Sequence, residues 1–229
     1  MDFTGERFVP GDKGLLETEH LERYNFASRY SKGKLILDIA CGTGYGSNIL
    51  LQGGASGVSG VEISPDATRY AEKHFGNELI SFTVANAETF CEGSYDLIVS
   101  FETLEHLTKR DAFLNNLHSM LKDDGVLIIS TPNKSITSPL KKPHKIRNPF
   151  HNYEYTEKEF TFVLQRAGFS IVEKYGQHLY PAFFKNELFS KLFRRLKIVS
   201  ARYCNRNTAV ISKLNGKTAR YFVFVVRKQ

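Results

Sequence analysis

The 229-residue chain has few cysteines and no long apolar run, and both absences narrow the class of protein. Its three cysteines, Cys41, Cys91 and Cys204, are odd in number and far apart, so they predict neither a disulfide framework nor a CxxC zinc site. No apolar run reaches the roughly 18–20 residues that a membrane-spanning helix needs. The N-terminus has an early acid, Asp2, and no apolar stretch, which predicts no secretory signal. We therefore expect an ordinary globular protein of the reducing cytoplasm.

The net charge of +7 is unevenly distributed along the chain. Residues 177–220 contain ten Lys and Arg residues and a single acid, Glu187. This local excess indicates an anionic partner, which is a phosphorylated substrate, a nucleic acid or an anionic membrane surface; the alternative is a solvated positive face without a partner. Within this region, residues 181–200 have apolar residues at i+4 spacing opposite basic ones. The pattern predicts an amphipathic helix that packs on the domain or lies on a membrane surface.

Strand-like and helix-like segments alternate along the chain, and no internal repeat interrupts them. Predicted strands are 34–40, 57–62, 80–85, 95–101, 125–131, 169–175 and 221–227. Predicted helices are 15–30, 48–51, 109–121, 156–167 and a helix that begins at Ser64 and Pro65. Such alternation predicts a doubly wound α/β fold, with a seven-stranded, mostly parallel sheet and helices on both faces.

We expect one domain over residues 1–229, with three parts outside the regular α/β pattern. These are an N-terminal helical cap (1–32), an active-site loop (133–155) and a basic helical insertion before the last strand (177–220). Within the second part, residues 133–150 are rich in Pro and Lys and predict a long structureless loop; such loops are usually lids or binding loops.

A glycine-containing turn, Asp38-Ile39-Ala40-Cys41-Gly42-Thr43-Gly44, follows the first strand and precedes a helix. Glycines there let the backbone approach a ligand, and the helix N-terminus offers N–H donors. The spacing does not match the G-x-G-x-x-G of dinucleotide-binding enzymes, because Ser47 follows Gly44-Tyr45-Gly46. Glu62 ends the second strand, where a carboxylate can accept hydrogen bonds from both ribose hydroxyls. Asn86 and Ala87 follow the third strand, where an adenine edge can lie.

With these motifs the chain resembles the class I S-adenosylmethionine-dependent methyltransferases over nearly its full length. The resemblance implies that Asp38 faces the methionine amino group and that Gly42 and Gly44 lie beside the adenosyl group. It also implies that Glu62 binds the ribose and that Asn86 and Ala87 contact the adenine. Two positions differ from the commonest pattern, since Ala40 replaces a frequent Gly and Asn86 a frequent Asp. The predicted cofactor set is Tyr24, Asp38, Ala40, Gly42, Gly44, Glu62, Ile63, Asn86 and Ala87.

A second group of polar residues, Glu102-Thr103-Leu104-Glu105-His106, follows the fourth strand. On a helix, E-x-x-E-H places two carboxylates one turn apart on one face. Residues just past the carboxyl ends of parallel strands face the ligand crevice. Imidazoles titrate near neutral pH, so His106 is a candidate general base for the acceptor proton. The same residues are also candidate ligands of a divalent cation that lowers the acceptor's pKa.

The segment Asn148 to Thr156, which contains His151, carries a further resemblance when it is paired with E-x-x-E-H. The pair resembles the metal-dependent small-RNA 2′-O-methyltransferases, whose ligand set implies a metal site at Glu102, Glu105, His106 and His151. It also resembles bacterial methyltransferases found with surface-polysaccharide genes. The opening Gly5–Gly11 and the stretch Glu19–Ala27 are similar to this second group in particular. Ubiquinone-type O-methyltransferases share only the E-x-x-E-H part.

These resemblances imply methyl transfer from S-adenosylmethionine to a hydroxyl of a small molecule, sugar, nucleotide sugar or glycan, with S-adenosylhomocysteine as product. The predicted catalytic residues are Glu102, Glu105, His106 and His151, with or without Mg, Mn, Fe or Zn. The loop residues Lys141, Lys142, Lys145 and Arg147 are expected to hold a phosphate of a sugar-phosphate acceptor.

Two alternatives remain open: a divalent-metal-dependent RNA 2′-O-methyltransferase, and a non-catalytic protein that binds S-adenosylmethionine. Nucleic acid is the less favoured partner, because few aromatic residues lie among the basic ones. An anionic membrane surface, reached from the cytoplasm, is a further expected contact of the 177–220 region.

Overall fold

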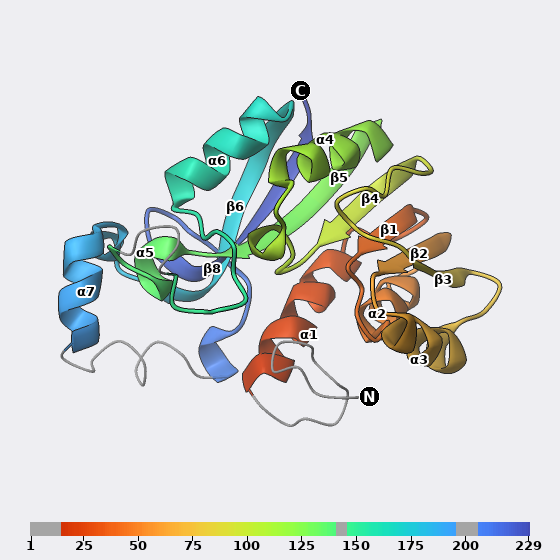
Figure 1. Ribbon diagram of the computed structural model, residues 1–229, viewed down its shortest axis with the longest axis horizontal. Coiled ribbons are helices and arrows are strands. Elements are labelled where there is room, and N and C mark those ends of the chain that lie inside the picture. Colours follow the sequence, from red (N-terminus) through yellow and green to blue (C-terminus); the bar gives the residue numbers. More distant parts are fainter. Residues whose placement is uncertain (1–14, 141–145, 196–205) are drawn as a thin grey trace.

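The computed structural model describes residues 15–140, 146–195 and 206–229, which form a layered α/β fold (Figure 1). One eight-stranded sheet has the order β3-β2-β1-β4-β5-β8-β6-β7. The strands are β1 (Leu35–Ile39), β2 (Gly57–Glu62), β3 (Ile80–Val84), β4 (Tyr95–Ser100), β5 (Leu121–Pro132), β6 (Phe169–Tyr180), β7 (Ser212–Lys213) and β8 (Thr218–Lys228). The first five are parallel neighbours, while β8 lies antiparallel between β5 and β6. The mostly parallel α/β fold is therefore confirmed.

Helices cover both faces of the sheet, as the alternation predicts. They are α1 (Leu15–Ser28), α2 (Tyr45–Gln52), α3 (Pro65–Phe75), α4 (Arg110–Met120), α5 (Lys134–Thr137), α6 (Glu157–Arg166) and α7 (Glu187–Arg195). Short 3₁₀ helices are η1 (Leu104–His106), η3 (Ala182–Lys185) and η4 (Arg206–Thr208). Successive residues of a strand point to opposite faces. In β1, Ile36 packs in the core with α1 and α2, whereas Leu37 packs in the core with α4 and α6.

Local signals in the sequence explain where several helices begin. The Ser64 hydroxyl accepts a hydrogen bond from the Ala67 amide, and Pro65 occupies the first turn of α3. Thr156 and Glu159 form a reciprocal capping box at the start of α6. The predicted starts of these two helices agree with the structure, whereas α2 begins at Tyr45 and not at the predicted residue 48.

The strand count of seven is wrong, because β7 adds an eighth strand. β7 has only two residues, Ser212–Lys213, which pair with Gly176 and Tyr175 of β6. A pair this short has no hydrophobic periodicity to reveal it. The strand predicted at 169–175 is also too short, because β6 continues to Tyr180 and pairs with β8 over that length.

The long loop and the basic insertion are both more structured than expected. Residues 133–150 include the short helix α5, which Asn133 caps by accepting a hydrogen bond from the Ser135 amide. The helix predicted over 181–200 is two pieces, η3 and α7, and 196–200 lie outside the described residues. Part of the 177–220 region is sheet rather than helix, since it contributes to β6, β7 and β8. The first 14 residues of the predicted cap, the lysines at 141, 142 and 145, and Cys204 also lie outside the described residues.

Among the helices that the structure describes, none is both long enough and apolar enough to cross a bilayer.

Candidate active site

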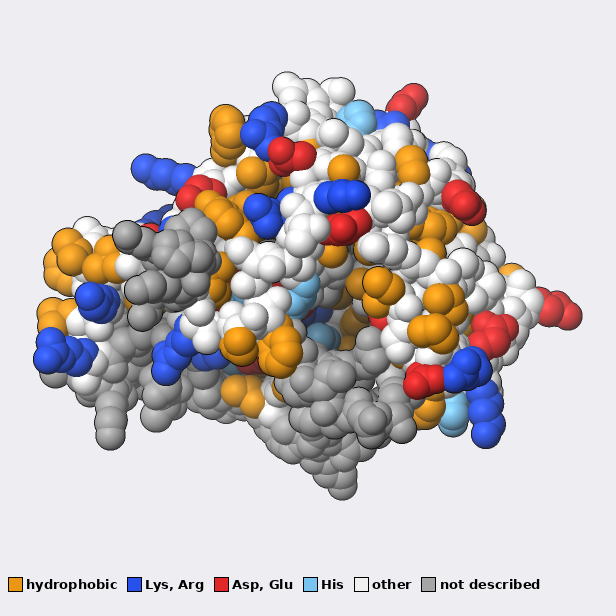
Figure 2. Space-filling view, in the orientation of Figure 1, with side chains coloured by type: hydrophobic (Ala, Val, Ile, Leu, Met, Phe, Trp, Pro, Cys, Tyr) orange, Lys and Arg blue, Asp and Glu red, His pale blue; other side chains and the backbone are white. Residues whose placement is uncertain are grey.

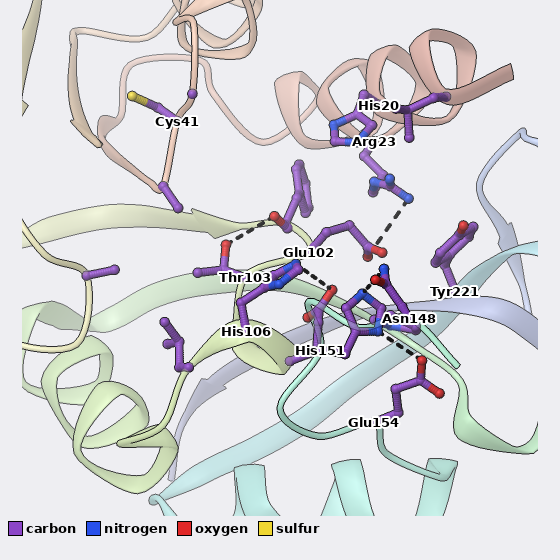
Figure 3. Close-up of a pocket in the computed structure, with 18 of the residues that line it drawn as sticks. His20, Arg23, Cys41, Glu102, Thr103, His106, Asn148, His151, Glu154 and Tyr221 are labelled. Carbon is purple, nitrogen blue, oxygen red and sulfur yellow. Dashed lines mark hydrogen bonds and ion pairs between the residues drawn. The ribbon is translucent and has the colours of Figure 1, made fainter. Parts of the chain in front are cut away.

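The carboxyl ends of the parallel strands border a large cavity of about 1280 Å³. Of the predicted cofactor residues, seven line it: Tyr24, Ala40, Gly42, Glu62, Ile63, Asn86 and Ala87. Three of the four predicted acceptor residues line it beside them as one cluster, Glu105, His106 and His151, and Glu102 lines it as well. The cavity therefore has a cofactor end at β1, β2 and β3 and an acceptor end at β4 and β5 (Figure 3).

Asp38 lies behind the wall of the cavity and is almost fully buried. The Tyr24 hydroxyl donates to one carboxylate oxygen at 3.0 Å, and the Ser47 hydroxyl donates to the other at 2.6 Å. Burial raises the pKa of Asp38 to about 6, and the hydrogen bonds from Ser47 and Tyr24 oppose the rise. Tyr24 therefore lines the cavity and also donates a hydrogen bond to Asp38. Sequence reasoning missed Ser47, which lies in the first turn of α2.

Gly44 and Ala40, in the turn after β1, both have a left-handed backbone conformation. Gly44 has a φ of 79°, and a Cβ there would lie 2.6 Å from the Ala71 Cβ. Ala40 has a φ of 62°, a left-handed conformation that favours glycine. The departure from the family pattern at position 40 therefore leaves an alanine in a strained conformation.

Replacing Ala40 with glycine is expected to stabilise the protein. Relief of the left-handed strain is worth about 1 kcal/mol, which corresponds to a rise in Tm of roughly 2–4 °C for a chain of this size. Differential scanning calorimetry measures the shift. Ala67→Gly, in the first turns of α3, is the matched control and should lower Tm, because glycine weakens a helix. An unchanged or lower Tm for Ala40→Gly would contradict the strain at this turn.

Glu62 is the last residue of β2, and both oxygens of its carboxylate accept hydrogen bonds from backbone amides. Oε2 accepts from the Gly42 amide at 3.1 Å and Oε1 accepts from the Ser64 amide at 3.0 Å. The side chain therefore joins the β1 turn to the start of α3 while it lines the cavity. Each carboxylate oxygen has a second lone pair, so the geometry is compatible with two ribose hydroxyls.

Asn86 follows β3, and its side-chain oxygen accepts a hydrogen bond from the Glu88 amide at 2.9 Å. The expected contact with an adenine amino group would use the remaining lone pair of that oxygen. Ala87 is nearly buried and Ile63 is 61% exposed, and both line the cavity. These residues make a partly apolar edge suited to a flat base.

Glu102 and Glu105 do not lie one helical turn apart on one face, as the E-x-x-E-H spacing predicted. Glu102 has a φ of 50°, and only residues 104–106 form a 3₁₀ turn. The Glu102 carboxylate accepts from the Ser130 hydroxyl at 2.6 Å and lies 3.9 Å from an Nη of Arg23. Glu105 is fully buried and accepts from the Thr131 hydroxyl at 3.1 Å. Burial, and then the charge of Glu102, raise the pKa of Glu105 well above its usual range.

His106 and His151 meet edge to face, with ring centroids 4.9 Å apart (Figure 3). The Nδ1 of His106 lies 3.1 Å from the Phe150 carbonyl, so Nδ1 carries the proton of the neutral ring and Nε2 is the basic nitrogen. That Nε2 lies 4.0 Å from a carboxylate oxygen of Glu105. The loop that carries His151 is therefore attached to η1 through the ring of His106.

Glu154 orients His151. Its carboxylate lies 2.9 Å from the His151 Nδ1, and the Asn148 amide lies 2.9 Å from the Nε2. Although burial raises it, hydrogen bonds from His151 and Thr137 hold the pKa of Glu154 below its usual range. A charged Glu154 therefore accepts from the His151 ring.

A possible metal set in the described part of the chain is Glu105, His106 and His151, whose ligand atoms lie within 4.8 Å of one another. Glu102, the fourth predicted ligand, is outside this cluster because Ser130 and Arg23 hold it. One oxygen of Glu105, Oε1, is buried without a hydrogen-bond partner, which fits a missing cation or proton. One carboxylate and two imidazoles suit several divalent metals.

Arg23 is a buried residue of the acceptor end that sequence reasoning missed. Its Nη1 donates to the Gln177 side chain at 2.5 Å, and its guanidinium lies 5.2 Å from the ring centre of Tyr221. Glu19, four residues earlier on α1, pairs with the buried His178 at 2.6 Å. Helix α1 is therefore joined directly to β6 by buried side chains. The long sequence separation of these partners, from 154 to 159 residues, left no local signal.

The sheet order, the glycine turn after β1 and the carboxylate that ends β2 define the class of S-adenosylmethionine-dependent methyltransferases. The chain belongs to the family described as the methyltransferase domain, whose model matches residues 17–174. This range includes α1 from Glu17 onward, the whole cofactor end, and His106 and His151 of the acceptor end.

Individual relatives of the chain are also named as methyltransferases. A probable S-adenosylmethionine-dependent methyltransferase of Mycolicibacterium smegmatis is 28% identical over 178 residues, 77% of this chain and 68% of that protein. A similarly named protein of Mycobacterium tuberculosis is 28% identical over 179 residues, 77% of this chain and 64% of its own length. The chain therefore spans about two thirds of these relatives.

Among solved structures, the N-methyltransferase NodS of Bradyrhizobium japonicum, in complex with S-adenosylhomocysteine, has a TM-score of 0.63 at 16% identity. The match covers 95% of this chain and 89% of that one. At this identity the likeness shows the fold alone.

Proposed function

We propose that the protein transfers a methyl group from S-adenosylmethionine to a hydroxyl of a sugar, nucleotide sugar, glycan or similar small acceptor. The observation that supports O-methylation is the position of His106. Its Nδ1 is held by the Phe150 carbonyl, which makes Nε2 the nitrogen able to accept a proton in the cavity. A hydroxyl, unlike most amines, must lose its proton as the new bond forms, so a positioned base matters most for this acceptor.

The residues at the cofactor end fit S-adenosylmethionine. Bound there, this group supplies a methyl on a positively charged sulfur, which leaves as a neutral thioether. Asp38 and Tyr24 would hold the amino group of the methionine part, Glu62 the ribose, and Asn86 with Ala87 the adenine. His106 takes the proton of the acceptor oxygen while that oxygen forms its bond to the methyl carbon and the carbon–sulfur bond breaks. Alignment of the two partners then provides much of the rate.

The acceptor end favours an anionic acceptor. Arg23, Arg147, Arg195 and Arg220 line it. Guanidinium groups bind phosphate and carboxylate oxygens strongly, often through two parallel hydrogen bonds. A sugar phosphate or nucleotide sugar has both the hydroxyl and the negative charge that these residues would bind.

The direct experiment is a methyl-transfer assay with labelled S-adenosylmethionine and a panel of hydroxyl acceptors. The panel pairs each neutral sugar with its phosphorylated or nucleotide-linked form. We expect transfer to an oxygen and a preference for the anionic member of a pair. Transfer to nitrogen, or equal use of both members, would contradict the proposed acceptor. Tight cofactor binding without transfer to any acceptor would favour a non-catalytic protein.

Cofactor binding is expected to weaken in acid because Asp38 must be ionised to bind an ammonium group. Its pKa of about 6 lies above the ordinary 3.8, so the carboxylate becomes protonated as the pH falls through 6. Affinity for S-adenosylhomocysteine should then fall about tenfold for each pH unit below that point. Calorimetric titrations between pH 5 and 8 measure this.

Two variants test the origin of that pH dependence. Tyr24→Phe removes a hydrogen bond that lowers the pKa of Asp38, so the midpoint should move to higher pH. Asp38→Asn should bind weakly with no slope over the same range. A slope that survives in Asp38→Asn would assign the titration to another group.

A metal-assisted form of the same reaction is the second candidate, supported by the cluster of Glu105, His106 and His151. A cation there would lower the pKa of the acceptor hydroxyl. If this candidate is right, Mn²⁺ binds the wild-type protein in a calorimetric titration and does not bind the His151→Ala variant. The His118→Ala variant, which changes a histidine outside the cluster, still binds Mn²⁺. Full activity after exhaustive chelation would exclude the metal. Activity on short RNA that rises with the metal would instead select RNA 2′-O-methylation.

A further inference from the structure

Helix α7 and the preceding η3 carry an exposed apolar surface that the methyl-transfer reaction does not use. Four side chains form it, and we refer to them as the α7 surface: Phe183, Leu188, Phe189 and Leu192, which are 47%, 66%, 48% and 53% exposed. Phe183 contacts Phe189, with ring centroids 6.3 Å apart, so the surface is continuous from η3 into α7. Large apolar side chains gathered in this way usually mark a contact site.

The opposite side of α7 attaches the helix to the domain. Phe184 is buried with Ile136 of α5 and Tyr180 of β6, and Phe193 packs against this cluster. Ser190 is also buried on this side. Because its inner side already has a packed core, the helix does not need the α7 surface for its own docking. That surface is therefore available to a partner.

The charges around the α7 surface are basic. Lys191 and Arg195 are exposed on the same helix, and Lys185 is 44% exposed and lies 3.1 Å from Glu157. The single acid of α7, Glu187, accepts a hydrogen bond from the Leu140 amide. Figure 2 shows hydrophobic and basic side chains next to one another over the part of the molecule where Figure 1 places α7. A partner that fits this surface therefore has an apolar layer and negative charge next to each other.

We propose that the α7 surface docks on an anionic lipid bilayer. Leucine and phenylalanine on one side of a short helix, flanked by lysine and arginine, can insert between acyl chains while the cations meet lipid headgroups. The helix lies in the plane of the interface. This contact is peripheral.

The docked orientation places the cavity close to the bilayer. Arg195 of α7 and Tyr180, which packs on Phe184, both line its acceptor end. An acceptor whose polar group projects from the bilayer would thus approach the cavity from the α7 side. The lipid contact itself does not depend on the proposed methyl transfer, and it can be tested without any acceptor.

The chain lacks tryptophan, so a single introduced tryptophan is the only source of indole fluorescence. Phe189→Trp places one indole on the α7 surface, and Phe162→Trp places one at a 60% exposed position of α6 as the matched control. On addition of phosphatidylcholine vesicles with 30% phosphatidylglycerol, we expect a blue shift for Phe189→Trp and none for Phe162→Trp. Pure phosphatidylcholine vesicles should give a much smaller shift, since the cations then find no anionic headgroups. A blue shift of both variants, or of neither, would overturn the proposal.

Vesicle sedimentation tests the unlabelled protein. Leu192→Asp should weaken binding to the anionic vesicles at least about tenfold. Leu79→Asp, which changes an equally exposed leucine (53%) before β3, should leave it unchanged. High salt should weaken wild-type binding. Unaltered S-adenosylhomocysteine affinity of both variants shows that they are folded.

Sedimentation velocity separates the lipid from a second copy of the chain as occupant. A wild-type dimer that Leu192→Asp converts to a monomer, together with no sedimentation on anionic vesicles, would assign the α7 surface to self-association. Wild-type binding to vesicles that is equal for Leu192→Asp would place the lipid contact elsewhere. Either result would refute docking through α7.

Discussion

His106→Ala is expected to lower kcat by about 10²- to 10⁴-fold while S-adenosylhomocysteine binds as tightly as before. The reason is the position of its ring, whose Nδ1 is held by the Phe150 carbonyl and whose Nε2 lies at the acceptor end of the cavity. Without this base the acceptor hydroxyl must attack while it retains its proton. Steady-state rates with the acceptor found by the panel, and calorimetry with the product cofactor, measure the two quantities.

A second variant and a surface histidine sharpen this test. His106→Gln keeps a polar group of similar length but cannot act as a base near neutral pH, so its rate should stay as low as that of His106→Ala. His74→Ala changes an exposed histidine of α3 and should leave kcat unaltered. If His106→Ala retains most of its activity, either the acceptor is not a hydroxyl or another group takes the proton.

Glu62→Ala is expected to weaken S-adenosylhomocysteine binding by about 10- to 100-fold, since hydrogen bonds to a charged group are worth about 1.5–3 kcal/mol each. The variant loses the proposed bonds to the ribose. It also frees the amides of Gly42 and Ser64, which the two carboxylate oxygens hold at 3.1 and 3.0 Å. Isothermal titration calorimetry gives the change in affinity.

Glu62→Gln separates these effects, because its amide NH₂ must face one of two backbone donors and cannot accept from it. We expect it to bind about tenfold more weakly than the parent. Glu78→Ala, on the exposed turn before β3, is the control and should bind like the parent. Parental affinity in Glu62→Ala would remove the ribose from this end of the cavity, and with it the proposed orientation of the cofactor.

The residues of the cofactor end could be predicted from the sequence because they follow strands that are recognisable as short apolar runs. Asp38 and Glu62 come at the ends of short apolar runs, and parallel strands bring such ends to one edge of the sheet. The fold class follows from the same alternation. The length of β6 does not, because Gln177 and His178 are buried polar residues, whose partners on α1 only the tertiary structure provides.

The acceptor end was predicted in part. Glu105, His106 and His151 lie close together in the structure, but the position of the fourth predicted member, Glu102, depended on a helical spacing that the backbone does not adopt. A left-handed residue, Glu102, lies two positions after the end of β4, and this conformation changes the direction of its side chain. Residue spacing carries no information about that conformation. Arg23 had no local signal at all.

Tyr24 and Arg23 are neighbours on α1, yet one holds the carboxylate proposed for the donor and the other borders the acceptor pocket. The sites proposed for the two substrates therefore share one helix, α1. A change that shifts this helix is expected to alter both affinities together.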